Sequence, residues 1–159
     1  MKRSDYLSWN DYFMAVAQLS AQRSKDPNTQ VGACIVNTKN RIVGVGYNGF
    51  PNGCSDDEFS WDRDGDFLNT KYAFVCHSEQ NAIISSTCDL EGATLFVTLF
   101  PCNECAKLII QSGIKQIYYL IDKYKEQDSY KVSRRLFDTA GVRYEQYIPE
   151  KDIIEVWMK

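Results

Sequence analysis

The sequence predicts an α/β fold, a three-layer α/β/α sandwich around a five-stranded mixed sheet. Helix-like and strand-like patterns alternate along the chain after an initial pair of short strands, and such alternation is typical of this architecture. The chain has 159 residues, of which 44% are apolar, enough for the core of one compact domain of ordinary size. We therefore expect residues 1–159 to form a single domain.

The first elements are a helix and a hairpin. Apolar side chains recur at helical spacing over about residues 9–23, which predicts an amphipathic helix. Pro27 ends this pattern, because proline disfavours helical backbone at the residue before it. Val31–Val36 and Ile42–Val45 are short apolar runs joined by polar, turn-like residues, and they predict a β-hairpin.

Residues 48–72 then show no regular pattern, and a loop of this length in a small domain is often functional. Regular patterns return afterwards. Pro101 suits the first position of a helix, where its missing N–H costs little. The remaining expected elements are a helix over residues 78–86, a strand over 94–98, a helix over 101–112, a strand over 115–120, a helix over 129–140 and a strand over 142–147.

The charge of the chain favours a small phosphorylated ligand over a polynucleotide. The net charge is −3 and the basic residues are scattered, whereas proteins that grip nucleic acid cluster their cations against several phosphates. No apolar run approaches the roughly 20 residues needed to cross a bilayer, and the N-terminal residues lack the apolar centre of a secretory signal. We expect a cytoplasmic protein with neither membrane nor nucleic acid as partner.

Three side chains have the types and spacing of metal ligands. Cys102 and Cys105 form the only C-x-x-C pair among six cysteines, and residues three apart share one face of a helix. The N-terminus of such a helix favours the thiolate form. His77 is the only histidine, and it precedes Glu79 by two positions. Together H-x-E and P-C-x-x-C form the sequence signature of zinc deaminases.

The ligand set predicts one catalytic Zn²⁺ ion per chain. Three protein ligands leave the fourth position open, which is typical of catalytic zinc, whereas structural sites are closed by four ligands. The ion lowers the pKa of a bound water toward about 7. Glu79 is the predicted proton carrier, from water to a ring nitrogen and later to the departing amine. Because residues two apart diverge in a regular helix, we expect His77 and Glu79 at a helix start.

Beyond this motif, three longer blocks resemble deoxycytidylate (dCMP) deaminases of the cytidine/deoxycytidylate deaminase family. They are SKDPNTQVGA over residues 24–33, GVGYNGFPNGCSDD over 44–57 and FPCNECAK over 100–107. The resemblance implies a cytidine-deaminase-like fold and the hydrolysis of dCMP to dUMP and ammonia, which supplies dUMP for dTTP synthesis. It also implies activation by dCTP, inhibition by dTTP and a homo-oligomer, in this family commonly a hexamer.

The same resemblance implies roles for residues around the metal. The backbone near Ser78 should hold the pyrimidine edge, and Asn48 should hydrogen-bond the sugar. Tyr124 corresponds to a family position near the substrate. Other expected contacts are Ser24, Lys25 and Asn28 for the 5′-phosphate, and Gly46, Tyr47, Asn48, Gly49, Asn52, Gly53 and Asp56 for an effector nucleotide. Plain alternatives remain for these positions: helix termination, turn formation and loop packing.

Some features leave alternatives open. Ser78 stands where the family usually has alanine, and its hydroxyl could alter the pocket. The other cysteines are interpreted as ordinary thiols: Cys34, Cys54, Cys76 and Cys88. Three rival functions remain: a deaminase acting on a tRNA or DNA base, a non-enzymatic module with a structural zinc, and an inactive regulatory homologue. A nucleic-acid enzyme needs a basic groove and aromatic platforms, and a structural zinc needs a fourth protein ligand.

Overall fold

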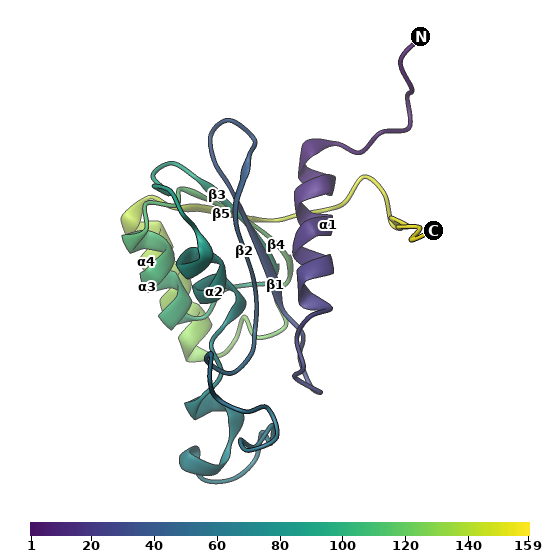
Figure 1. Ribbon diagram of the computed structural model, residues 1–159. Coiled ribbons are helices and arrows are strands. Elements are labelled where there is room, and N and C mark those ends of the chain that lie inside the picture. Colours follow the sequence, from purple (N-terminus) through teal and green to yellow (C-terminus); the bar gives the residue numbers. More distant parts are fainter.

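The structure, a computed structural model that describes residues 1–159, places a mixed sheet between two helical layers (Figure 1). The helices are α1 (Trp9–Ala21), α2 (Ser78–Ser85), α3 (Asn103–Gln111) and α4 (Asp128–Ala140). The strands are β1 (Gly32–Val36), β2 (Ile42–Tyr47), β3 (Thr94–Leu99), β4 (Gln116–Ile121) and β5 (Arg143–Gln146). No helix combines the length and the apolar character that are needed to cross a membrane.

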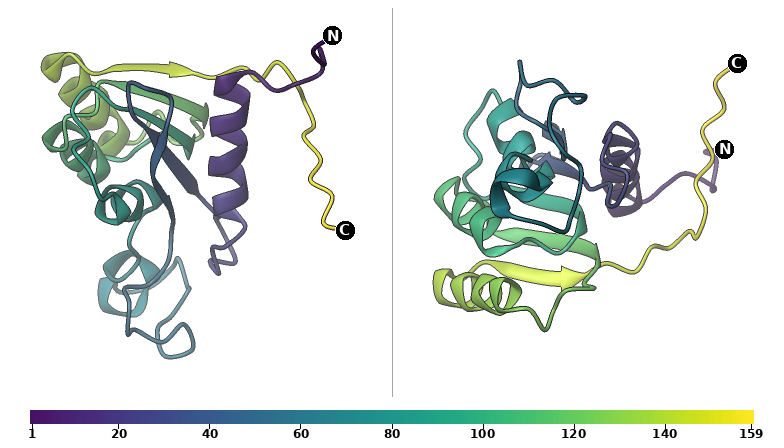
Figure 2. Two further views of the ribbon diagram at one scale, coloured as in Figure 1. Left: turned by 45° about the horizontal axis from the view of Figure 1, so that its top comes forward. Right: turned by 90° about the horizontal axis from the view of Figure 1, so that it is seen from below.

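The sheet has the strand order β2-β1-β3-β4-β5. β1 pairs antiparallel with β2 and β3, whereas β3, β4 and β5 run parallel to one another. Helix α1 covers one face of this sheet, and α2, α3 and α4 cover the other (Figures 1 and 2). The predicted three-layer α/β/α sandwich around a five-stranded mixed sheet, with its initial hairpin, is therefore confirmed.

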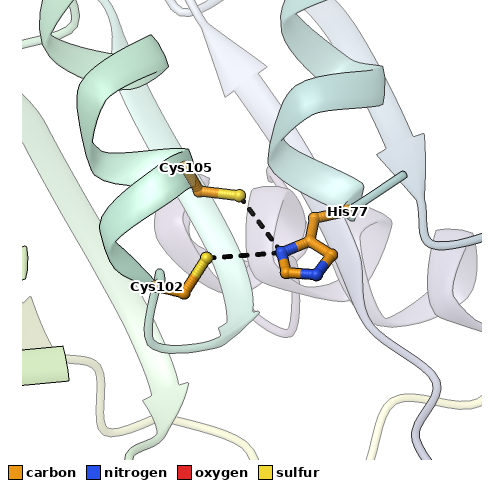
Figure 3. Close-up of side chains that lie close together, drawn as sticks. All are labelled: His77, Cys102 and Cys105. Atoms are coloured by element: carbon orange, nitrogen blue, oxygen red, sulfur yellow. Dashed lines mark hydrogen bonds between the residues drawn. The ribbon is translucent and has the colours of Figure 1, made fainter. Parts of the chain in front are cut away.

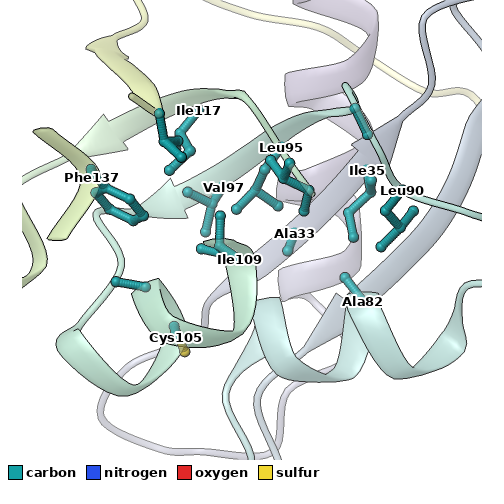
Figure 4. Close-up of a cluster of buried hydrophobic side chains, with 14 of the residues drawn as sticks. Ala33, Ile35, Ala82, Leu90, Leu95, Val97, Cys105, Ile109, Ile117 and Phe137 are labelled. Atoms are coloured by element: carbon teal, nitrogen blue, oxygen red, sulfur yellow. The ribbon is translucent and has the colours of Figure 1, made fainter. Parts of the chain in front are cut away.

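Side chains of β3 alternate between the two faces of the sheet and contribute to the hydrophobic core on each face. Leu95 and Val97 point into the main core beneath α2, α3 and α4, which also includes Ile109 (Figure 4). Phe96, between them, packs with Phe13 of α1 on the opposite face, because successive side chains of a strand point to opposite sides. Both helical layers are thus anchored on the same central strand.

Helix α2 lies close against β2 because β2 carries glycines at the contact. A Cβ atom on Gly46 would lie only 2.3 Å from the carbonyl oxygen of Ser78 and 2.4 Å from the nitrogen of Ala82. One turn further along α2, a Cβ on Gly44 would lie 2.4 Å from the carbonyl oxygen of Ala82. These two positions fix the distance between the strand and the helix backbone.

The start of α3 differs from its prediction. Pro101 does not occupy the first helical position, because Cys102 is the N-cap residue and Asn103 begins the helix. The backbone of Cys102 is extended, and its carbonyl oxygen accepts the first helical hydrogen bond, from Ala106 N at 2.8 Å. Cys102 is therefore the N-cap residue of α3, whereas the sequence predicted that it lies within the helix.

The segment between β2 and α2, residues 48–77, extends beyond the end of the sheet (Figure 1). It includes the range 48–72 that was predicted to be irregular, and it continues past this range to the start of α2 at Ser78. We call it the β2–α2 excursion. It contains two short 3₁₀ turns, Phe67–Asn69 and Lys71–Ala73. Lys71 is buried, and its ammonium pairs with the buried carboxylate of Asp26 between α1 and β1. This ion pair ties the excursion to the body of the domain.

Candidate active site

The three predicted metal ligands meet at one point. Nδ1 of His77 lies 3.4 Å from Sγ of Cys102 and 3.4 Å from Sγ of Cys105 (Figure 3). The three ligand atoms lie within 4.8 Å of one another. Tetrahedral zinc with its usual Zn–N and Zn–S lengths needs an N···S separation of about 3.5 Å. The residues present therefore fit a Zn²⁺ ion bound through Nδ1 and two sulfurs.

Two helix N-termini bring these ligands together. His77 is the N-cap of α2, so the prediction that it lies at a helix start is confirmed. Cys102 is the N-cap of α3, and Cys105 is the third residue of that helix. Neither side chain makes the usual capping hydrogen bond at its helix N-terminus. Both side chains are therefore free to bind a metal, and the positive ends of two helices favour thiolates beside them.

Contacts among the three ligands shift their pKa values in different directions. A hydrogen bond with Cys102 raises the pKa of His77 to about 9, against the effect of burial. A hydrogen bond from Cys105 lowers the pKa of Cys102 to about 4, whereas the same bond and burial raise the pKa of Cys105. Zinc requires a neutral imidazole and two thiolates, so binding of the ion is coupled to deprotonation of its ligands.

Glu79 stands beside the ligands and outside the ligand group. It is the second residue of α2, its side chain is buried, and burial raises the pKa of its carboxyl. The hydroxyl of Ser78 donates a hydrogen bond of 2.9 Å to Glu79 Oε2. The residue that replaces the family's usual alanine therefore contacts the carboxylate directly, through its side chain.

A cavity opens above these residues and draws its walls from separate parts of the chain. The loop between α1 and β1 contributes one wall, the β2–α2 excursion another, and the loop between β4 and α4 a third. Its polar and aromatic lining includes Asp26, Thr29, Asn48, Arg63, Lys71, Tyr72, His77, Ser78, Glu79, Cys102, Tyr124, Gln127 and Tyr130. Two of the metal ligands, His77 and Cys102, and the carboxylate of Glu79 thus face one space that is accessible to a small molecule.

Among the predicted substrate contacts, Asn48, Ser78 and Tyr124 line this cavity. The side chain of Asn48 is already engaged by the protein, since its Oδ1 accepts from Val31 N at 2.8 Å and its Nδ2 donates to Thr29 O at 2.9 Å. Asn48 therefore braces the cavity wall, and its proposed bond to a sugar remains a prediction.

The residues predicted to bind phosphate lie outside the lining of the cavity. Ser24 donates its hydroxyl hydrogen to Asn48 O at 2.9 Å, and Asn28 donates to Trp61 O at 3.2 Å. Lys25 pairs with Asp56. As the structure has them, these three side chains hold loops together around the cavity.

A second, smaller hollow collects nearly all of the predicted effector residues. It is lined by Tyr47, Asn48, Gly49, Asn52, Gly53 and Asp56, together with Arg23, Lys25, Phe50, Pro51 and Cys54. Gly46 is not part of this lining, because it lies beneath the backbone of α2.

Sequence reasoning missed the contribution of the β2–α2 excursion. Arg63, Lys71 and Tyr72 line the main cavity, yet they lie in a segment without periodicity or a recognisable motif. Its unusual length was the only signal that pointed to a functional role.

Comparison with known proteins agrees with this geometry. The family model described as "Cytidine and deoxycytidylate deaminase zinc-binding region" matches residues 7–121. The chain belongs to this family. The matched range includes all three metal ligands and Glu79, so the chain is an enzyme of a zinc-binding deaminase family, with a His/Cys/Cys site for one zinc ion.

Its relatives in the family cover most of the chain. It is 60% identical over 151 residues to the deoxycytidylate deaminase of Pongo abelii, covering 94% of this chain and 85% of that one. It is 54% identical over 162 residues to the probable deoxycytidylate deaminase of Drosophila melanogaster, covering 98% and 80%. The crystal structure of dCMP deaminase from the cyanophage S-TIM5 in complex with dCMP and dUMP superposes with a TM-score of 0.69 at 29% identity, covering 92% and 100%.

Proposed function

We propose that this enzyme hydrolyses dCMP to dUMP and ammonia and so supplies dUMP for dTTP synthesis. The observation that carries the proposal is a buried carboxylate, Glu79, beside a three-ligand His/Cys/Cys site at one cavity, which Glu79, His77 and Cys102 line. Relatives that are 54 to 60% identical over most of the chain are described as deoxycytidylate deaminases or probable deoxycytidylate deaminases. Zinc dependence is part of the proposal.

The side chains divide the chemistry between them. When bound to the three ligands, Zn²⁺ supplies a Lewis acid that makes water acidic near neutral pH. Glu79 takes a proton from the attacking water and delivers it to the neighbouring ring nitrogen. It then takes the proton of the hydroxyl group that has been added to the ring carbon and passes it to the amine, which leaves as ammonia while the ring carbon becomes a carbonyl. The hydroxyl of Ser78 donates to Oε2 of Glu79 and so helps to orient the carboxylate.

The substrate contacts inferred from the family remain part of this proposal. The backbone at Ser78 holds the pyrimidine edge, Asn48 bonds to the sugar, and Tyr124 lies beside the nucleotide. Ser24, Lys25 and Asn28 are the phosphate contacts inferred from the sequence. Support comes from the cavity, which Asn48, Ser78 and Tyr124 line.

Replacing Glu79 by glutamine tests the proposed reaction. We expect Glu79→Gln to bind zinc as the wild type does but to lose roughly 10²- to 10⁴-fold in dCMP turnover, because the amide cannot carry the proton. Glu104→Gln is a matched control, since Glu104 is an exposed carboxylate at the start of α3. Near-normal turnover by Glu79→Gln would refute the role of this residue, and turnover of a single-stranded oligonucleotide alone would refute the substrate.

Regulation and assembly form a separate part of the proposal. We infer that dCTP activates and dTTP inhibits the enzyme through the smaller hollow, in a cytoplasmic homohexamer. The hollow gathers Arg23 and the Lys25–Asp56 ion pair with the glycines Gly49 and Gly53, and glycine backbone beside a cation suits phosphates. Kinetics on dCMP with each triphosphate, and a mass measurement in solution, test this part. Unchanged kinetics with both triphosphates would remove the allosteric claim and leave the catalytic one.

A further inference from the structure

The main cavity has one cation that no carboxylate neutralises. Of the two basic side chains in its lining, Lys71 is buried and paired with Asp26. Arg63 is exposed, and it forms no ion pair although Asp62 and Asp64 flank it in the sequence. Its positive charge is therefore available to a ligand in the cavity.

The guanidinium of Arg63 is held in place by one edge only. Its Nε donates to the hydroxyl of Tyr72 at 3.2 Å, and its terminal nitrogens have no hydrogen-bond partner. The backbone beside it is anchored as well, since Lys71 N donates to Asp62 O at 3.0 Å. A guanidinium fixed through Nε presents its two outer nitrogens together, which is the geometry that binds a phosphate with two parallel hydrogen bonds.

The distribution of charges in the cavity lining also favours a phosphate as the ligand of Arg63. The acidic groups in the lining are Asp26, which Lys71 neutralises, and Glu79, which lies beside the metal ligands. Lys25, the cation that the sequence assigned to phosphate, pairs with Asp56 and lies outside this lining. An anionic substituent of a substrate therefore finds its complement in Arg63.

We propose that Arg63 binds the 5′-phosphate of the substrate and makes the enzyme select a nucleotide over the corresponding nucleoside. This inference rests on the proposed function, because it concerns the substrate of the same cavity. Arg63 acts on binding and takes no part in proton transfer. Its loss therefore raises KM for dCMP and leaves kcat nearly unchanged.

The kinetics of Arg63→Gln and Arg63→Lys on dCMP and deoxycytidine test the proposal. We expect Arg63→Gln to raise KM for dCMP about 10- to 100-fold, the range for a lost charge-assisted hydrogen bond. The KM and kcat for deoxycytidine, and the kcat for dCMP, should stay within about twofold of the wild-type values. Arg63→Lys should raise KM for dCMP less than Arg63→Gln does, because lysine keeps the positive charge but lacks the two parallel N–H donors of the guanidinium.

Two further variants sharpen the outcome. Arg143→Gln on β5 is a matched control, since Arg143 is exposed and lies outside the cavity. An unchanged KM for dCMP in Arg63→Gln, or an equal rise for both substrates, would overturn the assignment. If KM for dCMP rises in Lys25→Gln and not in Arg63→Gln, the phosphate is bound by Lys25, as the sequence implied, and the assignment to Arg63 is wrong.

Binding of the product separates this inference from the proposed function. Calorimetry compares dUMP with deoxyuridine on the wild type and on Arg63→Gln. A preference for dUMP that vanishes in the variant supports the role of Arg63 even if dCMP is not deaminated, in which case only the proposed function fails. Equal affinity of the wild type for dUMP and deoxyuridine would overturn the inference whatever the activity.

Discussion

Replacing Gly46 by alanine probes how β2 positions the catalytic residues. The added methyl group would meet backbone atoms of Ser78 and Ala82 at 2.3 and 2.4 Å. Ordinary van der Waals contact begins at 3.4 Å, so α2 has to move away from β2 by 3.4 − 2.3 = 1.1 Å. Backbone atoms cannot rotate aside as a flexible side chain can. The displacement therefore falls on the first turn of α2, which carries His77 and Glu79.

Such a shift affects catalysis more than folding. Overfilling a packed interface costs about 1–3 kcal/mol, which corresponds to a fall in melting temperature of roughly 3–10 °C for a chain of this size. A displacement of about 1 Å at a reacting group can cost 10²-fold in rate. We expect Gly46→Ala to lose about 100-fold in kcat and to bind zinc more weakly, because His77 moves relative to Cys102 and Cys105.

The assay combines deamination of dCMP with zinc content and thermal unfolding of the same preparations. Val45→Ala is the matched control, since Val45 is the neighbouring residue of β2 and its side chain is exposed. We expect that control to behave like the wild type. Wild-type kcat and zinc content in a folded Gly46→Ala variant would show that the distance between α2 and β2 does not set the catalytic geometry.

Three other substitutions test separate contacts. Ser78→Ala removes the hydroxyl donor to Glu79 and should lower kcat for dCMP about three- to tenfold at unchanged KM and zinc content; equal kcat would show that the bond is idle. Burial raises the pKa of Cys34 from 9.0 to about 12, so the unfolded chain loses this proton first as the pH rises. Wild-type stability should therefore fall by up to about 1.4 kcal/mol per pH unit between these values, and denaturant unfolding of Cys34→Ala should show a shallower slope. Lys71→Met strands the buried carboxylate of Asp26 and should cost about 3–5 kcal/mol in the free energy of unfolding, of which an added Asp26→Asn recovers part; a stable single variant would contradict the buried pair.

Local patterns predicted the order of elements well because each depends on neighbours in the sequence. The hairpin and the alternation of helices and strands follow from apolar periodicity and turn residues, and the helix start at His77 follows from the need for His77 and Glu79 to converge. The predicted start of α3 was wrong by two residues, because the helix begins at Asn103 and not at Pro101. A proline suits more than one position near a helix N-terminus, and here Cys102 supplies the capping carbonyl.

The ligand set could be predicted because the chemistry of zinc restricts which residues bind it. The cavity walls could not, because they depend on contacts between distant positions. Lys71 meets Asp26 across 45 positions of the sequence, and no local pattern signals such a pair. Arg63 enters the cavity only because this pair and neighbouring backbone bonds hold the excursion in place.

The separation between rigid helices and the β2–α2 excursion bears on how this enzyme can diversify. The reacting groups lie at the starts of α2 and α3, and Cys105 also belongs to the main core. A substitution of Cys105 therefore lowers both the stability of the fold and the affinity for the metal. The excursion lies outside the five strands of the sheet, and contacts such as the Lys71–Asp26 ion pair tie it to the body of the domain. Substitutions in residues 50–75 of the excursion can therefore change the substrate-binding wall of the cavity while the metal ligands and Glu79 stay in place.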